Sequence, residues 1–339
     1  MQTQQTPPPS VQMFQMITGF WTSCCIYVAA QLNIADLLTG KAKTASELAE
    51  QTQTHAPSLY RLLRTLSGAG VFHENEKNEF ELTQLGSTLR SDVPGSLKYH
   101  AIMNLSYHYS AWGNLLQSIK TGEIAFDNLH NMTVWEYYEK NEAGIKNFNS
   151  AMNGVTQMVI PAVTAAYDFK PFKTIVDVGG GDGTLLCGIL QQAEQSMGIV
   201  YDMPHAKQQA LAKIEANNLQ SRCLFKEGSF FEAVPPGASA YVMKSVLHDW
   251  NDEDSKKIIR KVKEAMHQSS KLLMIEYLIP ERNIPHPAKL MDINMLVMTG
   301  GRGRTATEWQ QLIEDAGLKL SRIIPTQSPM FPIIEAQKL

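Results

Sequence analysis

Apolar residues in the first third of the chain recur at helical spacing. Residues 13–31 form a long and mostly apolar stretch, which predicts a single helix. Two shorter helices are predicted at residues 45–51 and 57–67. A polar turn between the apolar runs 71–73 and 80–82 predicts a hairpin. Helix, helix and hairpin in this order are typical of a winged-helix domain.

The pattern changes beyond residue 170, where short apolar runs alternate with helical segments. The first run, residues 174–178, leads into a glycine-rich loop. Later runs with the character of strands follow at 198–201, 240–244, 272–276, 320–324 and 332–335. Helices are predicted between them, for example at 253–266 and 308–316. This alternation predicts an α/β fold, a doubly wound Rossmann-like sheet that binds ligands at the carboxyl ends of its strands.

The charge balance bears on the winged-helix pattern, because the best-known use of such domains is DNA binding. The chain has 339 residues, with 30 Lys+Arg against 33 Asp+Glu and a formal net charge of −3. The second predicted helix shows only Arg61 and Arg64 outward, and the hairpin tip is acidic. Nucleic-acid binding requires clustered positive charge. We therefore expect no nucleic-acid partner and interpret this region as a packing or dimerisation module.

The sequence carries no evident targeting or metal-binding pattern. Residues 1–12 contain three prolines and neither Lys nor Arg, which is typical of a flexible arm rather than a secretory signal. The most apolar early stretch, 19–38, is interrupted by polar residues, so we expect no membrane-spanning helix and no membrane partner. We expect a cytoplasmic protein without a metal. Its thiols, which lack zinc-ligand spacing, should be buried and reduced: Cys24, Cys25, Cys187 and Cys223.

The loop Val176-Asp-Val-Gly-Gly-Gly-Asp-Gly183 follows the first predicted strand and opens a helix. Its glycines allow a tight turn and the close approach of a ligand. Asp202 ends the next strand, where a carboxylate accepts hydrogen bonds from both hydroxyls of a ribose. The glycine spacing is G-x-G-x-G rather than the G-x-G-x-x-G of dinucleotide sites, and Asp177 and Asp182 would repel a pyrophosphate. These acids suit a cationic nucleoside such as the sulfonium S-adenosylmethionine.

Six motifs together make the chain similar to a known family. They are Val176-Asp-Val-Gly-Gly-Gly-Asp-Gly183, Tyr201-Asp-Met-Pro-His205, Gly228-Ser-Phe-Phe231, Lys244-Ser-Val-Leu-His-Asp-Trp250, Glu276-Tyr-Leu-Ile-Pro280 and Gly300-Gly-Arg-Gly-Arg-Thr305. Over nearly its whole length the chain resembles the S-adenosylmethionine-dependent small-molecule O-methyltransferases of the caffeic acid, acetylserotonin and bacterial natural-product type. The resemblance implies a homodimer in which the N-terminal half packs against the second subunit and helps to close its acceptor pocket.

The resemblance also implies roles for single residues. Five match the family's cofactor-binding positions: Gly179, Asp202, Ser229, Phe230 and Lys244. His248 matches the catalytic base, and Glu276 matches the acid that orients it. Aromatic and thioether side chains adapt to a flat ring, and the acceptor pocket is expected at Phe148, Met152 and Met295. A methionine at any one of these places is equally consistent with ordinary core packing.

Two positions depart from the family pattern. Ser229 stands where the family usually has Asp, which changes one contact on the adenine side of the cofactor. Gly303 stands where the family often has a second acid beside the histidine. The histidine would then be held by Glu276 alone or by another acid, Asp249 or Asp292.

The chemistry of methyl transfer gives a separate reason to single out His248. A phenol has a pKa of about 10, so at neutral pH it is mostly protonated and a poor nucleophile. A neutral imidazole accepts that proton as the oxygen attacks the methyl carbon, and a carboxylate behind the ring fixes the tautomer. His248 comes just after the predicted strand 240–244, at the ligand-binding edge of the sheet.

We therefore expect four regions: a flexible arm at 1–12, a winged-helix-like dimerisation domain at 13–110, a helical linker contributing to the acceptor pocket at 111–170, and an S-adenosylmethionine-binding catalytic domain at 171–339. The expected function, in secondary metabolism, is methyl transfer to a hydroxyl of a small aromatic acceptor. The glycine spacing argues against a nicotinamide-dependent oxidoreductase. A ligand-sensing winged-helix regulator, or the same fold with decarboxylase or hydroxylase chemistry, remains an alternative.

Overall fold

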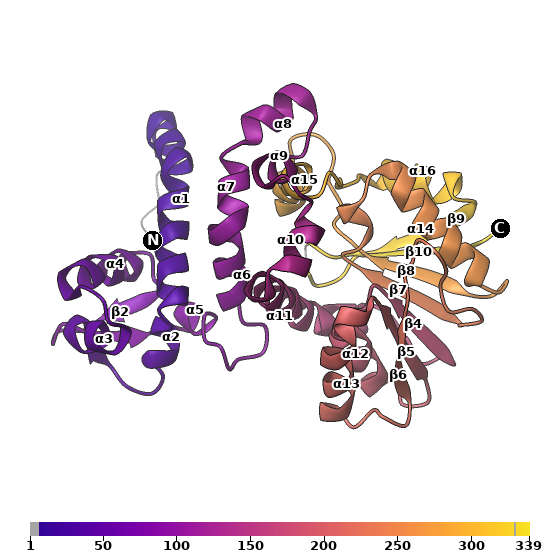
Figure 1. Cartoon of the computed structure of the whole chain (residues 1–339), viewed down its shortest axis with the longest axis horizontal. Coiled ribbons are helices and arrows are strands. Elements are labelled where there is room, and N and C mark those ends of the chain that lie inside the picture. Colours follow the sequence, from indigo (N-terminus) through magenta and orange to yellow (C-terminus); the bar gives the residue numbers. More distant parts are fainter. Residues whose placement is uncertain (1–6, 329) are drawn as a thin grey trace, which may run out of the picture. The chain divides into compact units, whose positions relative to one another are not determined.

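The computed structural model describes residues 7–328 and 330–339. These residues fall into two compact units (Figure 1). The first comprises the chain up to residue 109 together with residues 146–154. The second comprises residues 110–145 and 155–339.

The first unit opens with the long helix α1 (Pro9–Gln31). This helix begins four residues before the predicted start, because proline is tolerated in the first turn of a helix. Residues 9–12 of the predicted flexible arm are therefore helical, and residues 1–6 of that arm lie outside the described part of the chain. By length and composition alone α1 could cross a membrane, contrary to the expectation that no helix would meet these criteria.

The helix–helix–hairpin order of the first unit is as predicted. Helix α3 (Ala45–Thr52) begins with a capping box between Thr44 and Glu47, and α4 (Ala56–Gly68) buries its leucine face. Strands β2 (Phe72–Glu74) and β3 (Glu79–Leu82) form the hairpin. A third strand, β1 (Lys43–Thr44), pairs with β3 and was not predicted, because two residues carry no periodicity. The other helices of this part of the chain are α2 (Ile34–Leu37), α5 (Gln84–Ser87), α6 (Lys98–Met103) and a π-helical turn (Asn104–His108).

The predicted linker, residues 111–170, is helical but does not belong to a single unit. Its helices are α7 (Tyr109–Trp112), α8 (Leu115–Thr121), α9 (Ala125–His130), α10 (Val134–Lys140) and α11 (Glu142–Ala166). Residues 146–154 in the middle of α11 group with the first unit, and the rest of the helix groups with the second. The linker predicted from sequence is thus divided between the two units.

The second unit is built on a seven-stranded sheet with the order β6-β5-β4-β7-β8-β10-β9. Five neighbouring strands are parallel, and β10 runs antiparallel to both β8 and β9. Strand β6 was not predicted from sequence. The strands are β4 (Thr174–Val178), β5 (Met197–Asp202), β6 (Cys223–Glu227), β7 (Ala240–Lys244), β8 (Lys271–Ile275), β9 (Leu318–Ile324) and β10 (Ile333–Lys338).

Helices cover both faces of this sheet (Figure 1). On one face α12 (Thr184–Gln192) and α13 (Lys207–Ala216) pack on the sheet with the end of α11. On the other face α14 (Asp252–Ala265) and α16 (Ala306–Asp315) form a second apolar layer. Helix α15 (Pro287–Met298) lies between β8 and α16 in the chain. Cys187 and Cys223 are buried in the first of these layers, as expected, whereas the first unit's Cys24 and Cys25 are only half-buried.

The strand order reverses between β4 and β7, because β5 and β6 extend the sheet to one side and β8 to the other. Loops leaving two adjacent strands in opposite directions open a crevice at their carboxyl ends, which is the usual ligand site of such sheets. The loop after β4 is the glycine-rich motif, and the segment after β7 carries His248. The fold therefore brings the two most informative sequence motifs to one edge of the sheet.

Candidate functional site

The glycine loop between β4 and α12 is tightly enclosed by neighbouring segments. Its glycines at 179, 181 and 183 all have positive φ angles, of 70°, 56° and 75°, which only glycine adopts at low cost. A Cβ atom on Gly179 would lie 2.9 Å from a methyl carbon of Val246 and 3.6 Å from the ring of Phe230. The loop after β4 thus lies close to the segments that follow β6 and β7. Val246 and Phe230 fill the space that a side chain at position 179 would need.

Two acids lie beneath and beside this loop. Asp202 accepts hydrogen bonds from the backbone N–H groups of Gly181 (2.7 Å) and Met203 (2.6 Å). Asp177 is buried, and within the described parts of the chain its Oδ2 has no hydrogen-bond partner. Burial, together with the charge of Asp202, raises the pKa of Asp177 to about 7. A buried carboxylate oxygen without a partner is costly, so this site fits a positively charged ligand such as the one expected from sequence.

Lys244 ends β7, four residues before His248. Burial lowers the pKa of Lys244 to about 8, against the attraction of Glu276 and Asp177. Its ammonium group lies 5.4 Å from the centre of the Phe331 ring and donates to Ser245 Oγ (3.2 Å). Ser245 has a φ of 56°, an uncommon conformation for a residue with a side chain. The chain therefore turns sharply after β7. Uncommon backbone conformations of this kind cluster at functional sites.

Glu276 holds the segment of His248 with both of its oxygens. Its Oε1 accepts from the backbone N–H groups of Val246 and Leu247, each at 2.8 Å. Its Oε2 lies 2.6 Å from Nδ1 of His248. A carboxylate only accepts, so Nδ1 donates to it and Nε2 carries the lone pair of the neutral ring. The sequence-based pairing of these two residues is present as a fully buried hydrogen bond.

The charges beside His248 oppose the effect of its burial. Burial alone would lower the pKa of His248, but the charges of Glu276 and Asp249 outweigh it and raise that pKa above its ordinary value. Burial would raise the pKa of Glu276, yet His248 and the two backbone donors hold it below its usual range. Burial raises the pKa of Asp249 to about 6. Its Oδ1 lies 3.7 Å from Nε2 of His248.

Asp249 and Asp292, the two acids that could replace the family's second acid, have different partners in the structure. Asp249 lies beside the histidine, as described above. Asp292 instead accepts a hydrogen bond from the backbone N–H of Gly303 (2.8 Å). A Cβ atom on Gly303 would lie only 2.7 Å from a methyl of Ile279 and 3.2 Å from Cβ of Asp292. Asp292 therefore binds the backbone of Gly303, the position where the family often has its second acid.

The predicted adenine-side residues lie in an aromatic group. Phe230 packs edge-on against Trp250, with 6.1 Å between ring centres. Trp250 also stacks with Trp135 at 6.2 Å. Ser229 accepts a hydrogen bond from the backbone N–H of Phe231 (3.3 Å). Trp250 belongs to the sequence motif around His248, but only the fold connects it to the rings at 135 and 230.

The predicted acceptor residues are divided between the two units. Phe148 and Met152 lie on the part of α11 that groups with the first unit, and Met295 lies on α15 in the second unit. Met295 is buried. The role of all three in acceptor binding stays a prediction.

A contact near Met295 was not foreseen from sequence. The indole N–H of Trp112 donates to Oδ1 of Asn294 at 2.9 Å. An indole N–H only donates, which fixes the amide so that its nitrogen faces the other way, 3.8 Å from the sulfur of Met291. No sequence signal connects positions 112 and 294, because only the packing of α7 and α15 brings them together.

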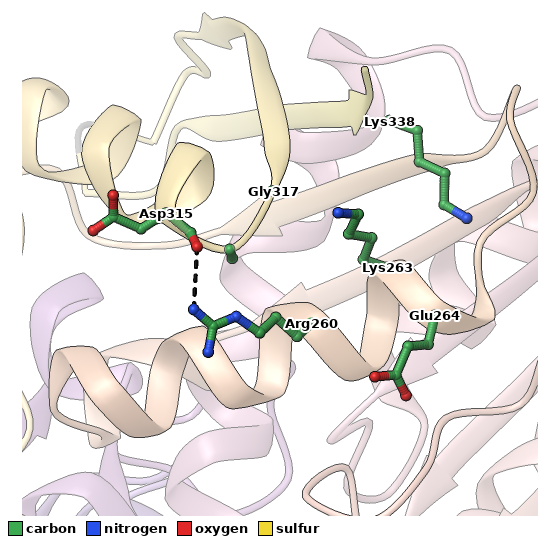
Figure 2. A pocket seen from close by; sticks show the side chains of 7 residues that line it. Arg260, Lys263, Glu264, Asp315, Gly317 and Lys338 are labelled. Carbon is green, nitrogen blue, oxygen red and sulfur yellow. Dashed lines mark hydrogen bonds between the residues drawn. The ribbon is translucent and has the colours of Figure 1, made fainter.

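A hollow of about 460 Å³ lies at the opposite edge of the sheet. Figure 2 shows its cations and acids, from the ends of α14, α16 and β10: Arg260, Lys263, Glu264, Asp315 and Lys338. Arg260 donates to the backbone carbonyl of Asp315 (3.2 Å), and Lys338 donates to that of Met266 (2.6 Å). Cations at helix C-termini satisfy carbonyls that lack a helical partner. The hollow is therefore explained by helix capping and is not a second candidate active site.

Comparison with known proteins agrees with this site. Residues 14–92 match the O-methyltransferase dimerisation domain, and residues 112–319 match the O-methyltransferase domain. The chain is 40% identical to phenazine O-methyltransferase PhzM of Lysobacter antibioticus, over 98% of this chain and 97% of that protein. It is 34% identical to a mitomycin biosynthesis 6-O-methyltransferase of Streptomyces lavendulae, over 95% and 93% of the two chains.

Solved structures show the same likeness in three dimensions. The crystal structure of LaPhzM superposes with a TM-score of 0.94 at 40% identity, covering 98% of this chain and all of that one. An O-methyltransferase from neocarzinostatin biosynthesis, solved with S-adenosyl-L-homocysteine and 1,4-dihydroxy-2-naphthoic acid, superposes with a TM-score of 0.79 at 31% identity, over 94% and 96%. The chain therefore belongs to the family of S-adenosylmethionine-dependent O-methyltransferases that carry an N-terminal dimerisation domain.

Proposed function

We propose that this O-methyltransferase methylates a hydroxyl group of a planar aromatic natural product, with His248 as the general base. The observation that carries the proposal is the buried 2.6 Å pair of His248 and Glu276 at the edge of the sheet that also bears the glycine loop. An imidazole fixed with its lone pair on Nε2 is what proton removal from a phenol requires.

The cofactor is S-adenosylmethionine, which supplies a methyl group activated by a positively charged sulfur. The sequence motifs assign Gly179 to its methionine part and Asp202 to its ribose hydroxyls, and the backbone N–H of Gly181 holds the carboxylate of Asp202 in place. Asp177 offers the unpartnered carboxylate oxygen to its positive charge. Phe230 and Ser229 flank the adenine, and Lys244 completes the set, as the sequence motifs imply.

His248 removes the acceptor's proton. Because Nδ1 donates to Glu276, the lone pair on Nε2 is available to the acceptor hydroxyl. As the acceptor oxygen bonds to the methyl carbon and the carbon–sulfur bond breaks, the hydroxyl proton passes to Nε2. The resulting imidazolium lies between two carboxylates, Glu276 on Nδ1 and Asp249 at 3.7 Å from Nε2. Their charges favour it, and this is what the raised pKa of His248 expresses.

The acceptor class follows from the relatives and the predicted pocket. The names of the similar proteins describe methyl transfer in the phenazine and mitomycin series, and one relative was solved with a dihydroxynaphthoic acid. All three are fused or quinone-like ring systems. We infer that this chain takes a flat, hydroxylated, multi-ring acceptor. The candidate contacts from sequence, whose side chains suit an aromatic face, are Phe148, Met152 and Met295.

A product assay tests this proposal directly. The protein is incubated with S-adenosylmethionine and a panel of hydroxyphenazines, hydroxyquinones and hydroxynaphthoates, and the products are analysed by mass spectrometry. We expect one hydroxyl to gain a methyl group and S-adenosylhomocysteine to accumulate in equal amount. Release of carbon dioxide, gain of oxygen, or methylation at nitrogen alone would contradict the proposal.

We also propose that the protein is a homodimer held by its dimerisation domain. Helix α1 exposes large apolar side chains to 45–77%: Met13, Phe14, Met16, Ile17, Phe20 and Trp21. An exposed apolar face of this length marks a binding surface, and the match to a dimerisation domain assigns it to a second copy. The opposing outcome is a membrane, because α1 is long and apolar enough to cross one.

Light scattering and vesicle flotation separate these outcomes. We expect a particle of twice 37.8 kDa that stays out of vesicles. The double substitution Phe14→Glu, Ile17→Glu should give monomers, whereas Leu211→Glu, at an exposed site on α13, should leave the dimer intact. A wild-type monomer at micromolar concentration, or flotation with the vesicles, would contradict the assignment.

A further inference from the structure

Arg304 is one of the largest side chains that the fold buries completely. It lies in the motif Gly300-Gly-Arg-Gly-Arg-Thr305, directly after the departure at Gly303. Burying a guanidinium group is costly unless every N–H finds a partner. The partners of Arg304 therefore tell what the burial achieves.

All five N–H donors of Arg304 are used. Nε donates to Oδ1 of Asp252 (3.0 Å). Nη1 donates to the carbonyl oxygens of Leu247 (3.0 Å) and Arg302 (3.3 Å). Nη2 donates to the carbonyl of Trp250 (3.1 Å) and to Oγ of Ser255 (3.0 Å). Two of these bonds hold the carbonyls immediately before and just after the pair His248-Asp249.

The backbone of Arg304 is fixed to the segment that follows Glu276. The N–H of Ile279 donates to the carbonyl of Arg304 (3.0 Å), and residues 278 and 304 form a parallel β-bridge. The guanidinium also lies 5.2 Å from the centre of the Trp309 ring. One residue thus connects the loop that carries the base with the segment that carries its acid.

We propose that Arg304 is a positioning residue for the general base. It holds the loop of residues 247–250 so that Nδ1 of His248 stays in line with Glu276 and Nε2 faces the acceptor. This inference rests on the proposed role of His248. Misplacement of a reacting group by about 1 Å costs on the order of 100-fold in rate, so loss of Arg304 should lower kcat by about 10- to 100-fold with little change in cofactor affinity.

The test compares Arg304→Ala and Arg304→Lys with Arg302→Ala. Arg302 also pairs with Asp252 but is 44% exposed, so it controls for the loss of a charge at the same acid. A lysine has its three donors at one point and cannot span the carbonyls of Leu247 and Trp250. We expect both Arg304 variants to lose kcat and Arg302→Ala to retain it. Added guanidinium should restore part of the activity of Arg304→Ala only.

A second readout does not depend on turnover. The short hydrogen bond between His248 and Glu276 should give a far-downfield proton resonance in the NMR spectrum of the wild type. We expect that resonance to persist in Arg302→Ala and to shift or disappear in Arg304→Lys. If Arg304→Ala does not fold, Ser255→Ala tests the same hold on the loop of residues 247–250, because Ser255 Oγ also donates to the carbonyl of Leu247 (3.1 Å). The Ser255→Ala variant should lose activity about 3- to 10-fold.

Two results would overturn the proposal. The first is a wild-type kcat together with an unchanged resonance in Arg304→Lys. The second is a loss of kcat in Arg304→Ala that guanidinium does not restore, although the resonance stays in place. The role of His248 fails separately. If His248→Ala keeps the wild-type rate, the base assignment is wrong, whereas the resonance in the Arg304 variants still reports whether Arg304 positions the ring.

Discussion

The pair His248–Glu276 and the glycine loop lie at the same edge of the same sheet, but they differ in whether their buried acids find hydrogen-bond partners within the protein. Around His248, Glu276 uses both oxygens: they accept from the backbone N–H groups of Val246 and Leu247 and from Nδ1 of His248. Arg304 in turn holds the carbonyl of Leu247. Beneath the loop, Asp177 is buried with an oxygen that has no partner in the described chain. The hydrogen-bonding groups around His248 are satisfied within the protein, whereas the region of Asp177 is stabilised by a cationic ligand.

The difference follows from what each region must do. A base has to keep its geometry while different acceptors and products come and go, so its hydrogen bonds are made within the protein. A cofactor site must be stabilised by its ligand, and a buried carboxylate without a partner supplies that differential free energy. The two regions should therefore respond in opposite ways to neutral substitutions of their acids.

Replacing Glu276 by Gln should give the largest effect. Val246 and Leu247 both require an acceptor, so the amide oxygen faces them and the amide nitrogen faces Nδ1 of His248. The ring must then accept at Nδ1 and carry its proton on Nε2, the wrong tautomer for a base. We expect kcat for a neutral phenol to fall by about 10² to 10⁴.

The matched control is Glu335→Gln, another buried acid in the same sheet, which binds Tyr167 and Arg322. That variant should melt at a lower temperature and keep its kcat. Equal kcat values for Glu276→Gln and the wild type would break the distinction between the two regions.

Replacing Asp202 by Ala should have the next largest effect, on affinity rather than on kcat. A charge-assisted hydrogen bond contributes about 1.5–3 kcal/mol, so calorimetry should show S-adenosylmethionine binding about 10- to 150-fold more weakly. Glu227 ends the neighbouring strand in register with Asp202, and its side chain is exposed. Glu227→Ala should bind the cofactor like the wild type. Unchanged affinity in Asp202→Ala would remove this residue from the site.

Replacing Asp177 by Asn should separate stability from binding. The folded-state pKa of about 7 lies above the unfolded value, so the wild type loses stability as pH rises from about 4 to 7. The cofactor-free variant should therefore melt higher than the wild type, and the advantage should grow over that range. A cationic ligand favours the ionised carboxylate, so wild-type affinity should rise with pH, by up to about tenfold per unit below pH 7.

Calorimetry in two buffers of different ionisation enthalpy measures the proton that Asp177 releases when S-adenosylmethionine binds. The Asp177→Asn variant should bind more weakly and release no such proton. A variant that melts lower than the wild type without cofactor would contradict the account of an unpaired buried acid. A control in Asp168→Asn, at an exposed position, should change neither quantity.

The sequence predicted the parts of the fold that have strong local signals. The capping box at Thr44 and the glycines after β4 fix element boundaries by themselves, and the strand at 174–178 appears with the bounds expected. Strand β6 and the two-residue strand β1 were missed, because β6 ends in the exposed, charged pair Lys226-Glu227 and so lacks a sustained apolar pattern, and β1 is too short for any period. The start of α1 was missed because prolines were interpreted as an arm.

The site shows the same division. His248 and Glu276 were found because both lie in motifs that resemble the family's, and His248 also follows a strand that could be recognised alone. The partners of Arg304, the choice between Asp249 and Asp292, and the contact of Trp112 with Asn294 required packing between distant segments. Sequence periodicity describes one element at a time and does not contain those contacts.

A pH–rate profile of His248→Ala shows whether His248 removes the acceptor's proton. Two acceptors of similar shape are compared, one phenol with a pKa near 10 and one acidic enough to be ionised at pH 7. The account predicts a loss of kcat of about 10² to 10⁴ for the neutral phenol at pH 7, a much smaller loss for the ionised one, and partial recovery of the neutral one as pH rises. Equal rates for variant and wild type with both acceptors would contradict it, because the protein would then align its substrates without a base.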